Sequence, residues 1–387
     1  MIGRTVSHFE SLENIRGEER FKNLLKRVKH DILYKRTWFV FLLIAIFTSG
    51  FSLEKDPVKT IWSISYFGDD DFFHEVSDIE VDLKRSMIYI ADSGNHRVLV
   101  FDFQGKLLKI IGKRGQGPAE FSKPTGIDIL EDSGVAVADF DNRRIQIFDK
   151  SWNFVKTIIT KGISVADLMF IGDKIFGISS SGLSGYRFTL RSEKKTQPLV
   201  HILDKTGDII QSISTDDFPD AHPFLRAIKN RVCLTLSHDD KLYLPYFAMN
   251  LIQVFDLNGE KIEEFERPLP FKPIAPKLLQ QSKNEGIVRM SVSSDAVTTD
   301  AQIGPDGNLY LLTCAESYSK RIREGERYED LPPQPMRIEV IEPKSHKVLR
   351  YISCDDNTRV FAVMDGNRLV YIYEDSEGEV ILKCIQF

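Results

Sequence analysis

The sequence predicts an all-β fold, a six-bladed β-propeller, on three observations. A motif repeats at a fixed offset, short alternating strands recur between turn-forming residues, and one spare strand precedes the first full unit. Units of about 40 to 50 residues with four strands each are typical of propeller blades. The 42% of hydrophobic and 28% of charged residues fit a globular chain, and 26 Phe with 12 Tyr favour strands.

The repeat is clearest between residues 87–112 and residues 134–159. Five residue pairs recur with a separation of 47 positions: Asp92 and Asp139, Asn95 and Asn142, Arg97 and Arg144, Phe101 and Phe148, Asp102 and Asp149. Within each copy the apolar residues alternate with a period of two, and Asp, Ser, Gly and Asn separate the runs. This pattern indicates antiparallel strands joined by hairpins and excludes solenoid helices.

The blade count follows from weaker copies of the third strand and its turn. They lie at residues 200–207, 253–259 and 339–343. With the two clear copies they make five full blades.

The C-terminus then supplies three more strands, at residues 359–364, 369–373 and 380–387. We expect residues 59–67 (KTIWSISYF) to be the missing fourth strand of this last blade. An N-terminal strand in that place closes the ring and leaves no open sheet edge. Residues 54–387 are therefore predicted to form one six-bladed propeller.

Residues 1–53 are predicted to be an N-terminal extension that carries an export signal. An apolar run, WFVFLLIAIF, extends from Trp38 to Phe47 after a basic flank and before small residues. This order is typical of a signal peptide. Extended to Leu53, the apolar core of residues 38–53 makes a short signal anchor, since a spanning helix needs about 20 residues. The long mixed-charge stretch before it suggests a start nearer Leu33.

We expect export to the periplasm or cell envelope, with membrane contact only through this segment if it stays uncleaved and anchors the chain in the inner membrane. No lipid anchor is expected, because Phe51 stands where lipidation requires Cys. The net charge of -5 argues against a nucleic-acid binder, which needs a basic surface. The four cysteines are expected to be small buried residues. The alternative, if the chain is exported, is a dispensable disulfide between Cys354 and Cys384.

Three stretches of blades one and two carry a resemblance to a known repeat. Residues 115–121 (GQGPAEF), residues 124–127 (PTGI) and residues 142–148 (NRRIQIF) resemble the NHL repeat. The chain as a whole is similar to six-bladed NHL-type propellers that Bacteroidetes-type bacteria export, many of them lipoproteins without an assigned activity. The match covers about a quarter of the chain, and Phe51 departs from the lipidated members.

Extra residues fall where the blades are connected. Residues 179–198 and 314–336 lengthen the turn between the second and third strands of blades three and five, and residues 215–229 and 267–290 form long inter-blade links. Long loops without strands of their own are more often functional than idle. The ligand-binding candidates in them combine aromatic with basic side chains: Tyr186, Arg187, Arg191, Tyr318, Arg321 and Arg323. Interspersed acidic residues favour the alternative, a solvated loop of mixed charge, over a cationic binding surface.

Two other sets of polar residues have predicted roles, one structural and one in metal binding. The repeated Asp-x-x-Asn-x-Arg element is expected to be structural, with Asp92, Asn95, Asp139 and Asn142 bonding their own turn backbone and Arg97 and Arg144 pairing with a carboxylate. If the protein is an enzyme, residues near the upper strand ends hold a divalent metal. The metal candidates are Asp78, Asp128 and His222, with His96, Asp167 and Asp300 nearby.

No metal-ligand spacing, nucleophile elbow or phosphate-binding loop accompanies these residues. The sequence thus favours a noncatalytic binding module for a peptide, glycan or protein partner, held by the long loops of blades three to five, and it predicts no cofactor. The alternative is a metal-assisted lyase or hydrolase with its site at the central channel. A third hypothesis is a membrane-anchored assembly scaffold.

Overall fold

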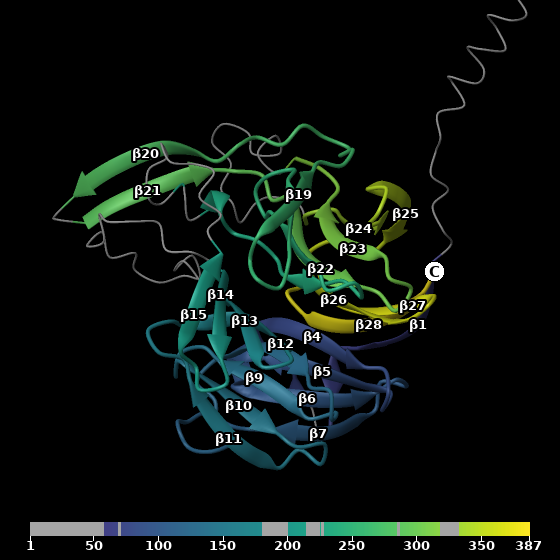
Figure 1. The fold of residues 1–387 in the computed structure, drawn as a ribbon. Helices are drawn as coiled ribbons and strands as arrows, with labels where there is room; N and C mark the ends of the chain where they lie inside the picture. Colours follow the sequence, from purple (N-terminus) through teal and green to yellow (C-terminus); the bar gives the residue numbers. More distant parts are fainter. Residues whose placement is uncertain are drawn as a thin grey trace, which may run out of the picture. The chain divides into compact units, whose positions relative to one another are not determined.

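The structure is a computed structural model that describes residues 58–68, 71–179, 200–213, 225, 228–284, 287–317 and 333–387. Residues Lys55–Phe387 form one compact unit. Six four-stranded antiparallel sheets are arranged as blades, which confirms the predicted all-β six-bladed propeller. Figure 1 shows the blades following one another in chain order, from purple and blue through teal and green to yellow. No helix of the described part is long and apolar enough to cross a membrane.

The first three blades follow the predicted repeat, each running from the innermost to the outermost strand. Their strands are β4 (Val76–Asp82), β5 (Met87–Asp92), β6 (Arg97–Asp102) and β7 (Leu107–Ile111); β8 (Pro124–Ile129), β9 (Val135–Asp139), β10 (Arg144–Phe148) and β11 (Phe154–Ile159); β12 (Val165–Ile171), β13 (Lys174–Ser179), β14 (Val200–Asp204) and β15 (Ile209–Ile213). A short 3-10 turn, η2 (Ser93–Asn95), joins β5 to β6.

Blades four to six keep the same order. Their strands are β16 (Thr235–Leu236), β17 (Leu242–Pro245), β18 (Ile252–Phe255) and β19 (Lys261–Phe265); β22 (Thr298–Ile303), β23 (Leu309–Cys314), β24 (Met336–Glu342) and β25 (Lys347–Ser353); β26 (Thr358–Asp365), β27 (Arg368–Glu374), β28 (Val380–Gln386) and β1 (Lys59–Ile64). Turns between second and third strands and links between blades open on one face of the ring, because neighbouring strands alternate in direction.

Strand β1 closes the ring as the sequence predicted. It pairs antiparallel with β28, from Lys59 opposite Gln386 to Ile64 opposite Leu382. The indole Nε1 of Trp62 donates to the carbonyl of Phe103 in blade one at 3.0 Å. The N-terminal strand therefore covers the outer edge of β28 and also contacts the first blade.

Two hairpins differ from the predicted connections. The strand expected over residues 59–67 ends at Ile64, and β2 (Tyr66–Phe67) pairs instead with β3 (Asp71–Phe72). The link over residues 267–290, expected to lack strands, contains the hairpin of β20 (Lys277–Asn284) and β21 (Ile287–Ser293), which extends past the blades in Figure 1. Both pairings are local. The two-residue strands β2 and β3 are too short to leave a pattern in the sequence, and β20 and β21 lie inside a link that was expected to have no strands.

The core consists of apolar side chains packed between neighbouring blades. Between blades six and one, for example, Leu99, Val370 and Cys384 are completely buried in one cluster. All four cysteines are free, so the disulfide considered for Cys354 and Cys384 is not formed. Cys384 instead packs in the core, and the Cys354 side chain is half-buried.

Removing β1 is expected to destabilise the ring far more than removing the segment before it. A chain that starts at Lys55 keeps β1 and should melt within a few degrees of the full chain, whereas one that starts at Tyr66 exposes the edge of β28. The shorter chain should melt at least about 10 °C lower and self-associate, measured by thermal unfolding and size-exclusion chromatography. Equal melting temperatures for the two truncations would show that β1 does not close the ring.

Candidate functional site

Carboxylates gather on the innermost strands, around the channel of the ring. Asp78 lies on β4, Asp128 on β8, Asp167 on β12 and Asp300 on β22, all half-buried, and Glu80 lies two residues after Asp78. Three of them, Asp78, Asp167 and Asp300, take the third position of their strand, directly after a register shift in its pairing with the second strand. The fold therefore brings acidic residues from four blades to one place.

These side chains join each blade to the next. The Oδ2 atom of Asp78 accepts from the amide of Ile127 at 2.6 Å, and Oδ2 of Asp128 accepts from the amide of Phe170 at 2.7 Å. The same arrangement recurs in later blades: Thr235 with the Ile303 amide at 3.0 Å, Asp300 with Phe361 at 3.0 Å and Gln302 with Val363 at 3.1 Å. In every case the acceptor belongs to one blade and the amide to the innermost strand of the following blade.

The channel carboxylates hold protons more strongly than free carboxyl groups. Burial, followed by the charge of Asp167, raises the pKa of Asp78 well above its usual range. Burial likewise raises the pKa of Asp128 and of Asp167 to about 7, and that of Asp300 to about 6. The pKa of Glu80 is also raised well above its usual range, by burial and by the charge of Asp128. Several of these groups are therefore partly protonated near neutral pH.

Asp78 and Asp128, two of the three metal candidates, lie on neighbouring inner strands, while His222 is outside the described residues. One oxygen of each aspartate is occupied by an amide of the next blade. His96 lies away from these strands, in the turn after η2, and its Nδ1 contacts the carbonyl of Ser122. Within the described ranges no three His, Cys, Asp or Glu residues are grouped so that they could hold a metal ion. A metal role for Asp78 and Asp128 stays a prediction.

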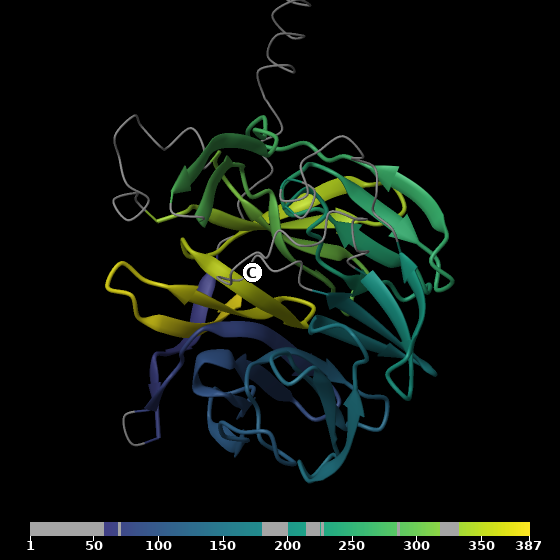
Figure 2. The same cartoon turned by 90° about the vertical axis from the view of Figure 1, so that its left-hand side faces the viewer.

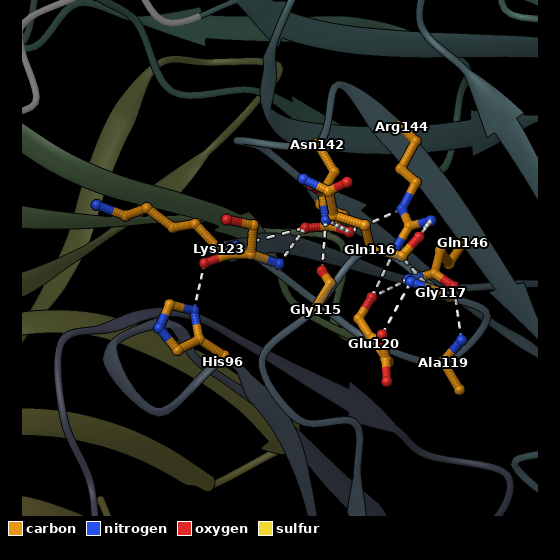
Figure 3. A network of polar contacts seen from close by, with 12 residues as sticks. His96, Gly115, Gln116, Gly117, Ala119, Glu120, Lys123, Asn142, Arg144 and Gln146 are labelled. Atoms are coloured by element: carbon orange, nitrogen blue, oxygen red, sulfur yellow. Dashed lines mark hydrogen bonds and ion pairs between the residues drawn. The ribbon is translucent and has the colours of Figure 1, made fainter.

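The repeated Asp, Asn and Arg form a buried clasp in blade two (Figure 3). The Oδ2 atom of Asp139 accepts from Nε of Arg144 and Nδ2 of Asn142, both at 2.8 Å, and Oδ1 accepts from the amide of Ser122 at 2.8 Å. Arg144 then donates to carbonyls of the incoming link: Gln116 at 2.6 Å, Gly117 at 2.9 Å and Glu120 at 2.7 Å. The clasp thus fixes the link from blade one.

Blade one contains the same clasp with a different link. Asp92 accepts from Arg97 at 2.7 Å and from Asn95 at 3.0 Å, and Arg97 also pairs with Asp71 through two hydrogen bonds. We expected Asp and Asn to bond their own turn. The structure shows instead that Asn95 donates to the carbonyl of Phe72, in the preceding link. Side chains of the turn reach that link because both open on the same face.

Blade five replaces the clasp by a different ion pair. Thr313 stands opposite Arg337 as Asp139 stands opposite Arg144, and the acidic group moves to Glu339. Glu339 accepts from Nε of Arg267 at 2.5 Å, and both side chains are fully buried. Arg267 comes from the link after blade four and also donates to Thr298 at 2.8 Å and to Thr313 at 3.1 Å. In blade two an arginine of the blade holds the carbonyls of the link, whereas in blade five an arginine of the link is held by side chains of the blade.

A hollow of about 380 Å³ opens at blade six on the face of the links. The link between β25 and β26 lines one side with Asp355 and Asp356, and the turn between β27 and β28 lines the other with Glu374 and Asp375. Tyr373 contributes its ring. The hollow is strongly acidic, with Lys383 bound to Asp355 at 2.8 Å.

The structure does not test the sequence-predicted ligand residues. Tyr186, Arg187, Arg191, Tyr318, Arg321 and Arg323 all lie outside the described residues, so their role stays a prediction. The residues around the hollow were not predicted from the sequence. The available signal was the number of acidic residues in two turns of the last blade, CDDN at 354–357 and EDSEGE at 374–379. Their closeness depends on the pairing of strands far apart in the sequence, so the pattern alone did not reveal it.

The channel carboxylates give the protein an unusual dependence of stability on pH. A carboxyl whose folded pKa is raised stabilises the fold below its unfolded pKa near 4, and this stability is lost as the pH rises through the folded value. For Asp128 and Asp167 that value is about 7. The free energy of unfolding from urea titrations should therefore fall between about pH 5 and about pH 8.

The variant Asp167→Asn should flatten this dependence and should be more stable than the natural chain by roughly 1 to 2 kcal/mol at about pH 8. Asp173→Asn is the control, since Lys205 lowers the pKa of that exposed carboxyl. Stability that rises with pH over this window in the natural chain would contradict the account.

Breaking the clasp is expected to be costly. Asp139→Ala leaves the buried Arg144 guanidinium without its carboxylate and should lower the free energy of unfolding by roughly 3 to 5 kcal/mol. Asp141→Ala removes an exposed carboxylate two residues away and should change it by less than about 0.5 kcal/mol. Denaturant titration of both variants measures the difference, and similar losses in the two would mean that the clasp adds little.

Comparison with known proteins agrees with this architecture. Residues 68–288 match the DUF5128 family, described as a 6-bladed beta-propeller. Protein lin-41 of Caenorhabditis elegans is 35% identical over 75 residues, which cover 19% of this chain and only 6% of that protein's length.

Two solved structures also resemble the chain. A DUF4221 member from Bacteroides vulgatus is 9% identical with a TM-score of 0.54, over 87% of this chain and 99% of that one. Virginiamycin B lyase from Staphylococcus aureus is 11% identical with a TM-score of 0.49, over 86% and 100%. At this identity the first likeness shows the fold alone, and no argument rests on the second. Because the family match covers more than half of the sequence, the chain belongs to the DUF5128 family of six-bladed β-propellers.

Proposed function

We propose that the protein is a noncatalytic binding module that holds a peptide, glycan or protein partner on the face where the links between blades open. The hollow at blade six is the observation that carries this proposal. Concave sites with a few convergent polar groups are where ligands usually bind, and about 380 Å³ accommodates one or two side chains. Tyr373 supplies an apolar surface, and Asp356 is an exposed acceptor.

The hydrogen bonds in the channel support a structural use of its carboxylates. Asp300 accepts from the amides of Ala301 and Phe361, one on each oxygen, so both oxygens are engaged. Asp78 has the same pattern with Ile79 and Ile127. Carboxylates committed to the backbone are poorly placed to act on a substrate.

One observation favours the alternative function, a metal-assisted lyase or hydrolase at the channel. Asp128 and Asp167 have pKa values raised to about 7, the range in which a carboxyl group can donate and accept protons at neutral pH. This alternative needs a substrate to reach the inner strands and a metal ligand set beyond the two aspartates.

We also propose that the protein is exported, because the run from Trp38 to Phe47 follows a basic flank and precedes small residues. Amino-terminal sequencing of the protein isolated from its own cells distinguishes cleavage after this run from retention as a membrane anchor.

The binding function is tested by screening the intact protein against peptide and glycan arrays. We expect saturable binding of at least one class of ligand, and mass spectrometry should recover that ligand unchanged after incubation with and without added Ca²⁺ or Zn²⁺. Metal-dependent conversion of the ligand would support the lyase or hydrolase instead. Absence of any saturable ligand would contradict the binding module.

A further inference from the structure

We infer that an exposed aromatic hairpin and the acidic hollow beside it form one docking surface for an extended peptide in which basic residues alternate with apolar or aromatic ones. This inference deepens the proposed function and rests on it. We call this surface the blade-six rim, and its residues are Tyr66, Phe72, Asp355, Asp356, Tyr373 and Asp375.

The apolar part of the blade-six rim is a pair of aromatic residues. Tyr66 and Phe72 stand directly opposite each other on β2 and β3, with 55% and 52% of their surfaces exposed. Their neighbours Phe67 and Phe73 point the other way and are almost completely buried. Adjacent large aromatic residues kept in water are costly unless a partner covers them, so they mark an interaction site.

The hairpin is held in place before any partner binds. Arg97 donates to both oxygens of Asp71, at 2.5 and 2.8 Å, and to the carbonyl of Phe72 at 3.0 Å. Asn95 donates to the same carbonyl at 2.9 Å. The clasp of blade one thus fixes the backbone that carries Phe72, and a prepared surface loses less entropy on binding.

A chain of hydrogen bonds joins the hairpin to the hollow. The hydroxyl of Tyr66 donates to Oε1 of Glu379 at 2.8 Å, and the amide of Glu379 donates to Oδ1 of Asp375 at 2.9 Å. Asp375 lines the hollow. Figure 2 shows the purple strands of this hairpin on the same side as the yellow strands of blade six. One extended peptide can therefore contact both parts.

The charge of the blade-six rim selects the partner. Two adjoining turns carry six carboxylates: Asp355, Asp356, Glu374, Asp375, Glu377 and Glu379. Only Lys383 and Arg359 pair with carboxylates of this group within the described residues. The described residues of this surface therefore carry a net negative charge beside exposed rings. Arg and Lys satisfy both features, because they pair with carboxylates and stack on aromatic faces.

The probe is a short fluorescent peptide of alternating Arg and Phe, titrated with the full chain and followed by fluorescence anisotropy. Two matched peptides carry Glu in place of Arg, or Ser in place of Phe. We expect saturable binding of the Arg and Phe peptide that weakens with added salt, and at least about 10-fold weaker binding of both matched peptides. Equal binding of the Glu peptide would overturn the predicted partner chemistry.

Variants test the location. Phe72→Ser and Asp356→Asn change exposed side chains and should each weaken binding about 5-fold. Ile210→Ser, on the outer strand of blade three, and Glu131→Gln, on the opposite face of the ring, are matched exposed controls and should change it less than about 2-fold. Melting temperatures near that of the natural chain show that all four variants are folded.

The outcomes separate this inference from the proposed function. If an array ligand binds the natural chain and both rim variants equally, the binding module stands and the blade-six rim is wrong. If a neutral glycan binds and is lost with Phe72→Ser, the location stands and the peptide partner is wrong. If neither the arrays nor the Arg and Phe peptide give saturable binding, both proposals fall.

Discussion

The closed ring depends on the channel-side amides of the innermost strands. Each of these strands pairs on one side only, which leaves amide groups facing the crowded centre. A buried amide without an acceptor costs about 1 to 3 kcal/mol. The preceding blade supplies the acceptor: Asp78 for Ile127, Asp128 for Phe170 and Asp300 for Phe361. These bonds satisfy the amides and connect each blade to the next, alongside the apolar packing between blades.

Placing carboxylate acceptors in the channel also determines its electrostatics. Acceptors from four blades meet in a small volume, so carboxylates such as Asp78 and Asp167 repel each other while losing water. Their raised pKa values are the result. Asp78, Asp128 and Asp300 accept hydrogen bonds between blades, whereas the proposed ligand site lies further out, at the exposed residues Tyr66, Phe72 and Asp356.

The links between blades are held by buried ion pairs. In blades one and two a buried Asp and Arg clasp the incoming link, and in blade five Arg267 from the link itself reaches Glu339. The clasp of blade one also holds Asp71 and Phe72, so the same residues that stabilise the repeat position the exposed aromatic pair. Structure and proposed function are in this way joined through Arg97.

Much of the fold was predictable because its signals are local. The Asp, Asn and Arg of blades one and two recur at one offset. The last blade had only three strands at the C-terminus, so residues 59–67 were predicted to supply the fourth. The hairpins β2–β3 and β20–β21 were not predicted, since strands of two residues, or strands inside a long link, leave no clear pattern. The roles of Asp78 and Asp128 as inter-blade acceptors and the acidic hollow were also missed. Both depend on residues that become neighbours only when blades or distant strands pair.

Amide hydrogen exchange tests the central claim most directly. If side chains of the preceding blade cap the inner strands, the amides of Ile127, Phe170 and Phe361 should exchange as slowly as the amides of central strands such as β5 and β9. Replacing Asp300 by Ala should speed exchange at Phe361 and leave Ile127 slow. Rapid exchange at all three amides in the natural chain, at rates typical of open turns, would contradict the account.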